Sequence, residues 1–210
     1  MITGDQRKAR GWRTVAEVLE LAAGGTVVLD PYSLLIGVRV QLGEGNVCYP
    51  GVVIECDEDS ECLLGSENTL LPGTFISATG GGAIHIGDST RIGEGGARIT
   101  ADRTGAPVEV GHRTRIVGGA ALAGPAVLGD GSQVLGPINA QGFELAAGAD
   151  WTYPDPDARG GVLKGFGRGR NVTVGTGEVI NGQGNFGTSR IERQRAYHPN
   201  APRLTAARPD

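Results

Sequence analysis

The chain has 210 residues, enough for one sizeable domain with its own hydrophobic core. It carries 19 Lys and Arg against 23 Asp and Glu, a formal net charge of -4, and no block of like charges, which argues against nucleic acid as a partner. No eighteen apolar residues run together and no apolar segment follows the charged start, so we expect a soluble, cytoplasmic protein without membrane contact.

The N-terminal segment, residues 1–25, predicts a single amphipathic helix that covers one end of the fold. Thr14 and Glu17 stand at the spacing of a capping box, and two glycines at 24 and 25 mark the end of the helix. The apolar residues that share one face of this helix are Val15, Val18, Leu19 and Ala22.

Residues 26–185 contain a six-residue pattern in which an apolar residue is followed by glycine or another small residue. The 37 glycines of the chain fall mainly within this pattern rather than in a low-complexity run. Such a period predicts an all-β fold, a parallel β-helix of hexapeptide repeats, and it fits better than the period-two alternation of a β-sandwich. The inward positions are Ile36, Leu42, Cys48, Ile54, Leu64, Leu70, Ile76, Ile86, Ile92, Val110, Ile116, Leu122, Leu128 and Val134.

Two later segments depart from this period. Residues 142–165 predict an excursion loop, which contains Trp151 and Tyr153 and has either a functional or a purely structural role. Residues 186–210 form a C-terminal tail with His198 in it. The three cysteines lack the paired spacing of a zinc site, and the three histidines lie 27 and 86 residues apart, so no metal is expected.

Three stretches resemble one known family. "GTVVLDPYSLLIGVRVQLGEGNVCYPGVVIE" (25–55), "VGHRTRIVGGAAL" (110–122) and "FGRGRNVTVGTGEVINGQGNFGTSR" (166–190) are similar to the acetyltransferase domain of the bifunctional N-acetylglucosamine-1-phosphate uridyltransferase/glucosamine-1-phosphate acetyltransferase family. The resemblance implies a left-handed β-helix with an N-terminal capping helix, a homotrimer and acetyl-CoA as the donor. Nothing resembles that family's nucleotidyltransferase domain, so uridyl transfer is not expected.

The resemblance also implies roles for individual residues. His112 matches the general base, and Ser189 and Arg190 match the pair that holds the donor. Arg91 and Arg115 flank the coils around His112 and are candidates for binding an anionic acceptor such as a sugar phosphate. Arg115 stands where the family has a tyrosine, and the family's lysine and its asparagine-tyrosine-aspartate motif have no match.

The leading hypothesis is therefore an acyltransferase that moves an acetyl or similar group from coenzyme A to an amine of a small molecule, such as an amino sugar. A histidine with a pKa near neutrality suits the base in such a reaction. Two alternatives stay open. One is a non-catalytic scaffold that binds a sugar nucleotide or a coenzyme, and the other is a different chemistry in a pocket formed by the loop around Trp151.

Overall fold

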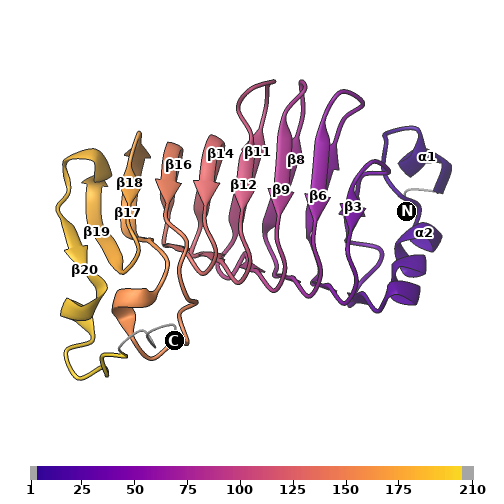
Figure 1. The fold of residues 1–210 in the computed structure, drawn as a ribbon. Helices are drawn as coiled ribbons and strands as arrows, with labels where there is room; N and C mark the ends of the chain where they lie inside the picture. Colours follow the sequence, from indigo (N-terminus) through magenta and orange to yellow (C-terminus); the bar gives the residue numbers. More distant parts are fainter. Residues whose placement is uncertain (1–3, 205–210) are drawn as a thin grey trace, which may run out of the picture.

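A computed structural model describes residues 4–204 and shows an all-β fold of short, mostly parallel strands stacked along one axis (Figure 1). Strands pair with partners one coil away rather than with their neighbours in sequence: β5 pairs with β8 and β6 pairs with β9, both in parallel. This arrangement is compatible with the predicted parallel β-helix. In Figure 1 the N-terminal helices lie at one end of the stack and β19 and β20 lie at the other.

The parallel pairs form three ladders, which we call the first, second and third faces. The first face contains β1 (Val27–Val28), β4 (Val47–Cys48), β7 (Thr69–Leu70), β10 (Arg91–Ile92), β13 (Arg115–Val117), β15 (Gln133–Leu135), the start of β17 (Val162–Arg170) and the start of β19 (Glu178–Asn185). The second contains β2 (Leu35–Ile36), β5 (Val53–Cys56), β8 (Thr74–Ala78), β11 (Ala97–Ala101), the starts of β14 (Ala120–Leu128) and β16 (Ile138–Leu145), and the ends of β17 and β19. The third contains β3 (Gln41–Leu42), β6 (Glu61–Leu64), β9 (Ala83–Ile86), β12 (Val108–Val110), the ends of β14 and β16, and β18 (Thr173–Val174).

The core is a column of aliphatic side chains inside the three faces. On the second face Ile54, Ile76, Ile99 and Leu122 are successive register partners, and each is at most 1% exposed. The inward residues predicted from the six-residue pattern are all buried except Leu42, which is half-buried. Burying a Leu or Ile side chain stabilises a fold by roughly 1.5–3 kcal/mol, so this column supplies the main favourable term.

The coils differ in length because residues are inserted at the corners. Ile116 pairs with Val134, eighteen residues later, whereas Ile54 pairs with Ile76, twenty-two residues later. The additional residues form turns between the second and third faces at 57–60 and 79–82. These turns account for the interruption of the six-residue pattern before Leu64.

The N-terminal cap is made of α1 (Gly4–Lys8), α2 (Val15–Glu20) and the short 3-10 helix η1 (Leu21–Gly24). The predicted capping box is confirmed, because the Thr14 hydroxyl accepts a hydrogen bond from the Glu17 amide and the Glu17 carboxylate accepts one from the Thr14 amide. Val18 is fully buried, but the expectation is wrong for Leu19, which is 50% exposed, and for Ala22, which is exposed as well. Because α2 ends at Glu20 and tightens into η1, Leu21 packs against the core instead.

The sequence did not predict α1. Its attachment depends on Arg7, a buried arginine whose guanidinium donates hydrogen bonds to the carbonyl oxygens of Tyr32 (2.6 Å) and Leu34 (3.2 Å). No helix within residues 4–204 is long and apolar enough to cross a membrane.

The excursion loop is shorter than expected. Residues 142–145 belong to β16 and residues 162–165 belong to β17, which leaves 146–161; we call this segment the flap. It contains the short 3-10 helix η2 (Pro156–Ala158). The chain then ends with η3 (Phe186–Thr188), β20 (Ile191–Arg193), which is antiparallel to β19, and η4 (Gln194–Tyr197). We call residues 194–204 the arm.

Candidate functional site

His112 lies on the corner between β12 and β13, and its side chain is about half exposed (47%). Its Nδ1 accepts a hydrogen bond from the Asp88 amide of the preceding coil (2.9 Å), and its own amide donates to the Asp130 carboxylate of the next coil (2.9 Å). The same position in earlier coils behaves alike: Ser66 accepts from the Glu44 amide, and Asp88 accepts from the Ser66 amide. His112 is therefore one member of a ladder of side chains that cap the turns.

The protonation of His112 decides what this corner can do. When Nδ1 accepts the hydrogen bond from the Asp88 amide, the neutral ring carries its proton on Nε2. In this tautomer Nε2 cannot act as a base. A carboxylate oxygen of Asp88 also lies 3.2 Å from Nδ1. With the proton on Nδ1, the ring would donate to this carboxylate and leave Nε2 free as a base. The first state is a structural cap, and only the second can serve as the general base that the sequence predicts.

The other candidate residues are only partly brought together. Arg91 and Arg115 are register partners on the first face, and Arg91 is paired with Glu94 (3.1 Å). Ser189 and Arg190 follow β19, three strand spacings from β13, on the order of 15 Å along the axis. Within one chain, Ser189 and Arg190 therefore do not share a site with His112.

A pocket of about 260 Å³ lies on the outer surface of the first face, near its C-terminal end. Strands of the first face form its floor, and the flap and the arm form its walls. We call it the flap pocket. The floor residues are Arg115, Gln133, Leu135, Val162, Lys164 and Val179; the flap contributes Trp151 and Arg159, and the arm contributes Gln194, Tyr197 and His198.

The lining of the flap pocket carries three cations, on Arg115, Arg159 and Lys164, and no Asp or Glu. Within residues 4–204 none of the three forms an ion pair with a carboxylate. The Arg115 guanidinium lies over the Trp151 ring (5.0 Å), and its buried Nε has no hydrogen-bond partner. In a chain with a net charge of -4, this local excess of positive charge without carboxylate partners gives the pocket the electrostatics that attract an anion.

The arm adds two polar rings to this pocket. Arg159 Nη1 lies 3.5 Å from His198 Nε2, and because arginine only donates hydrogen bonds, the His198 nitrogen is the acceptor in this contact. The Tyr197 hydroxyl donates to the Glu192 carboxylate (2.5 Å) and accepts from the Asn181 amide (3.3 Å). The hydrogen bond to Glu192 raises the pKa of Tyr197, so its phenol stays neutral.

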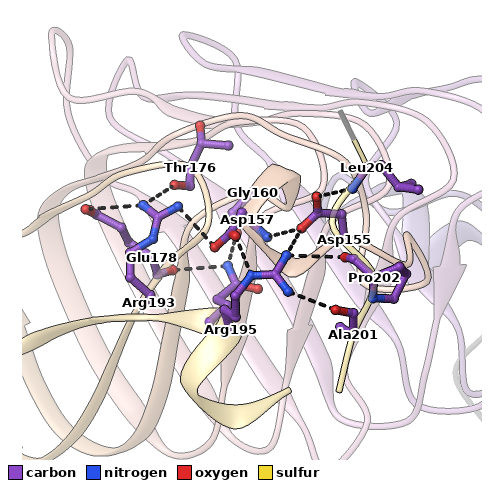
Figure 2. Close-up of polar contacts among 11 residues, drawn as sticks. Asp155, Asp157, Gly160, Thr176, Glu178, Arg193, Arg195, Ala201, Pro202 and Leu204 are labelled. Carbon is purple, nitrogen blue, oxygen red and sulfur yellow. Dashed lines mark hydrogen bonds and ion pairs between the residues drawn. The ribbon is translucent and has the colours of Figure 1, made fainter. Parts of the chain in front are cut away.

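Charged side chains tie the flap to the C-terminal segment (Figure 2). The Arg195 guanidinium of the arm donates through Nε to Asp157 and through Nη2 to Asp155, both in the flap. Arg193 of β20 lies 3.3 Å from Asp157. We call these four residues the clasp. In the sequence Arg193 and Arg195 extend the charge of Arg190, but in the structure both are paired with aspartates of the flap.

Two backbone contacts reinforce the clasp. The Leu204 amide donates to Asp155 (2.9 Å), and the buried Gln194 side chain donates to the Gly160 carbonyl (2.7 Å). The hydrogen bond from Leu204 is the largest cause that lowers the pKa of Asp155, and the one from Arg195 lowers the pKa of Asp157. Both carboxylates are therefore ionised at neutral pH.

Sequence reasoning pointed to Arg115 and to the loop around Trp151, but it missed Arg159 and Lys164. No motif marks them, because they meet only through the fold. Among the described residues, no group of three or more His, Cys, Asp or Glu side chains could hold a metal ion. Neither the known family models nor the curated proteins include a match to this chain.

Proposed function

We propose that the protein binds a small anionic molecule in the flap pocket. The observation that carries this proposal is the set of three cations that line one pocket without a carboxylate among the lining residues. Folding alone gives no reason to gather unpaired cations, because like charges repel and each loses hydration when it is partly covered. A bound anion would supply the missing partner through charge-assisted hydrogen bonds.

The size and charge of the pocket narrow the ligand. Sites for drug-sized molecules occupy roughly 300–1,000 Å³, and the flap pocket holds about 260 Å³. A whole coenzyme A or sugar nucleotide is too large, whereas a small phosphate ester or dicarboxylate fits. Three cations around one small pocket can neutralise a ligand that carries two negative charges. This supports a binding protein for a small dianion, which keeps the non-catalytic role of the predicted scaffold but replaces its sugar nucleotide or coenzyme with a smaller ligand.

Calorimetric titration with inorganic phosphate, glucosamine 1-phosphate, succinate and acetyl-CoA tests the proposal. Arg115→Gln and Lys164→Gln should each weaken binding of the best dianion about tenfold or more, because a hydrogen bond to a charged group contributes roughly 1.5–3 kcal/mol. Arg91→Gln is the matched control, since Arg91 lies one strand away on the same face but outside the pocket and is paired with Glu94. Equal binding by all three variants, or no binding by the wild type, would contradict the proposal.

A second candidate is acyl transfer from acetyl-CoA to an amine, on a left-handed β-helix that assembles as a homotrimer. The contact between the exposed His112 ring and the Asp88 carboxylate favours it, because a carboxylate at Nδ1 orients an imidazole to act as a base through Nε2. Ser189 and Arg190 would hold the donor, and a neighbouring copy would have to bring them to His112. Arg91 and Arg115 would receive the acceptor.

Turnover of acetyl-CoA against a panel of small amines tests this candidate, together with the molar mass from light scattering. The expected result is a trimer whose acetyl transfer is abolished by His112→Ala. Full activity of that variant would exclude His112 as the base, and a monomeric mass would exclude a site shared between copies.

A further inference from the structure

We propose that the arm, residues 194–204, is a lid over the flap pocket, and that the clasp is the latch that holds it closed. The inference rests on the proposed binding of an anion in this pocket. Closing the lid would complete the site around the ligand, and opening it would let the ligand enter and leave.

The arm forms one wall of the pocket. Gln194, Tyr197 and His198 line the pocket, and all three belong to the arm. The facing wall is the flap, with Trp151 and Arg159. The flap is an insertion between two strands of the fold, and the arm follows the last strand, so neither segment is needed to form the β ladders. The pocket therefore has this second wall only while the arm is docked against the flap.

Polar contacts rather than apolar burial hold the arm in place. Among residues 194–204 only Gln194 is buried, and the large apolar side chains Tyr197 and Leu204 are 43% and 46% exposed. A segment with few buried apolar contacts opens at low free energy compared with the core. Among the ion pairs of the arm the latch is well enclosed, because the Asp155 and Arg195 side chains are only 9% and 15% exposed.

The hinge lies next to the latch. β20 (Ile191–Arg193) is paired with β19 immediately before the arm begins, so it anchors the chain while the arm moves. Arg193 sits on the anchored side and Arg195 on the moving side of this point, and both contact Asp157. Releasing Arg195 from the two aspartates would free residues 195–204, while Gln194 keeps its hydrogen bonds to Gly160 and Glu178 and stays with β20.

Lid closure and ligand binding are then coupled. A ligand that contacts the arm binds the closed state better and shifts the population toward it. The apparent dissociation constant rises in inverse proportion to the closed fraction, so a variant that is closed about a tenth of the time binds about tenfold more weakly.

The test compares Asp155→Asn/Asp157→Asn with the wild type, using inorganic phosphate as the probe. The lid predicts about tenfold weaker phosphate binding in the double variant. Electrostatics alone predicts the opposite, because the variant has lost two negative charges beside a cationic pocket. Asp102→Asn, which removes an exposed aspartate paired with Arg103 away from the pocket, is the control and should bind normally. Arg195→Gln breaks the same latch from the arm and should also weaken binding.

Cleavage by trypsin after Arg195 and Arg203 gives a second readout that does not depend on affinity. Phosphate should slow cleavage of the wild-type arm, and both latch variants should be cut faster than the wild type. Unchanged or tighter phosphate binding and unchanged cleavage in the latch variants would overturn the lid. If the lid is overturned in this way but Arg115→Gln still weakens phosphate binding, the proposed anion site is kept and only the lid is rejected. If the wild type shows no saturable binding of any dianion in the panel, the proposed function and the lid fall together.

Discussion

Replacing His112 separates its two possible roles, because alanine removes both and asparagine removes only one. The Nδ1 atom of His112 accepts the Asp88 amide at 2.9 Å on an exposed corner, so one neutral hydrogen bond is at stake. Such a bond contributes about 0.5–1.5 kcal/mol, which for a domain of 150–250 residues corresponds to a fall in Tm of roughly 1–6 °C in His112→Ala. The side-chain oxygen of asparagine can accept this hydrogen bond as the carboxylate of Asp130 and the hydroxyl of Ser66 do in other coils. His112→Asn should therefore lose little stability.

Thermal unfolding followed by circular dichroism measures the stability of both variants, and acetyl-CoA turnover measures their activity. A general base is lost equally in alanine and asparagine, whereas a cap is lost only in alanine. Equal stability of His112→Ala and the wild type, or equal destabilisation by the two substitutions, would refute the assignment of His112 to the capping ladder.

Two further expectations concern the fold. Gly165 has φ +116°, and a Cβ there would lie 2.0 Å from a carbonyl oxygen of the next coil, whereas Gly51 has φ +76° with open space around it. In denaturant unfolding, Gly165→Ala should therefore lower the free energy of unfolding by about 3–5 kcal/mol and Gly51→Ala by only about 1–2 kcal/mol. Similar losses in the two variants would contradict this expectation. Burial lowers the pKa of His85, but its hydrogen bonds to Glu61 and Glu109 outweigh burial and raise that pKa. The resulting stabilisation is complete below the unfolded-state pKa of about 6.5 and is lost as the pH rises through the folded-state pKa. His85→Gln should therefore lower Tm more at about pH 5.5 than at about pH 8.5. A larger fall in Tm at the higher pH would show that the two glutamates do not stabilise the protonated ring.

The all-β fold and its inward residues could be predicted because each coil repeats the same local requirement. An apolar side chain such as Ile116 must point inward wherever the chain crosses a face, and this leaves a period in the sequence. Insertions are different. The flap was expected to be longer because the six-residue period is lost from residue 142 onward, yet residues 142–145 continue β16. Strand pairing with the neighbouring coils, which no local pattern records, outweighed the loss of period.

The candidate site was predictable only in part. Arg115 was recognised for its place beside His112, and the loop around Trp151 for its aromatic residues, but their stacking at 5.0 Å depends on how the flap folds back on the first face. Arg193 and Arg195 are visible in the sequence as charges of the tail. Nothing local identifies Asp157, 36 residues before Arg193 and 38 before Arg195, as their shared partner. Contacts between separate insertions leave no period and no spacing to read.

The two candidate sites differ in how much of their chemistry the fold already explains. At the corner, serine, aspartate and histidine do the same work at Ser66, Asp88 and His112, so the fold accepts any short acceptor there and the histidine needs no function to be tolerated. In the flap pocket, by contrast, the fold does not explain the residues present. Three cations share this pocket without a carboxylate, and the buried Nε of Arg115 has no hydrogen-bond partner, which costs the folded state free energy. The contacts of these cations with the Trp151 and Tyr197 rings and with the Tyr153 carbonyl leave their charge without a counter-charge. The pocket is therefore the stronger functional signal, since a bound anion would offset this cost.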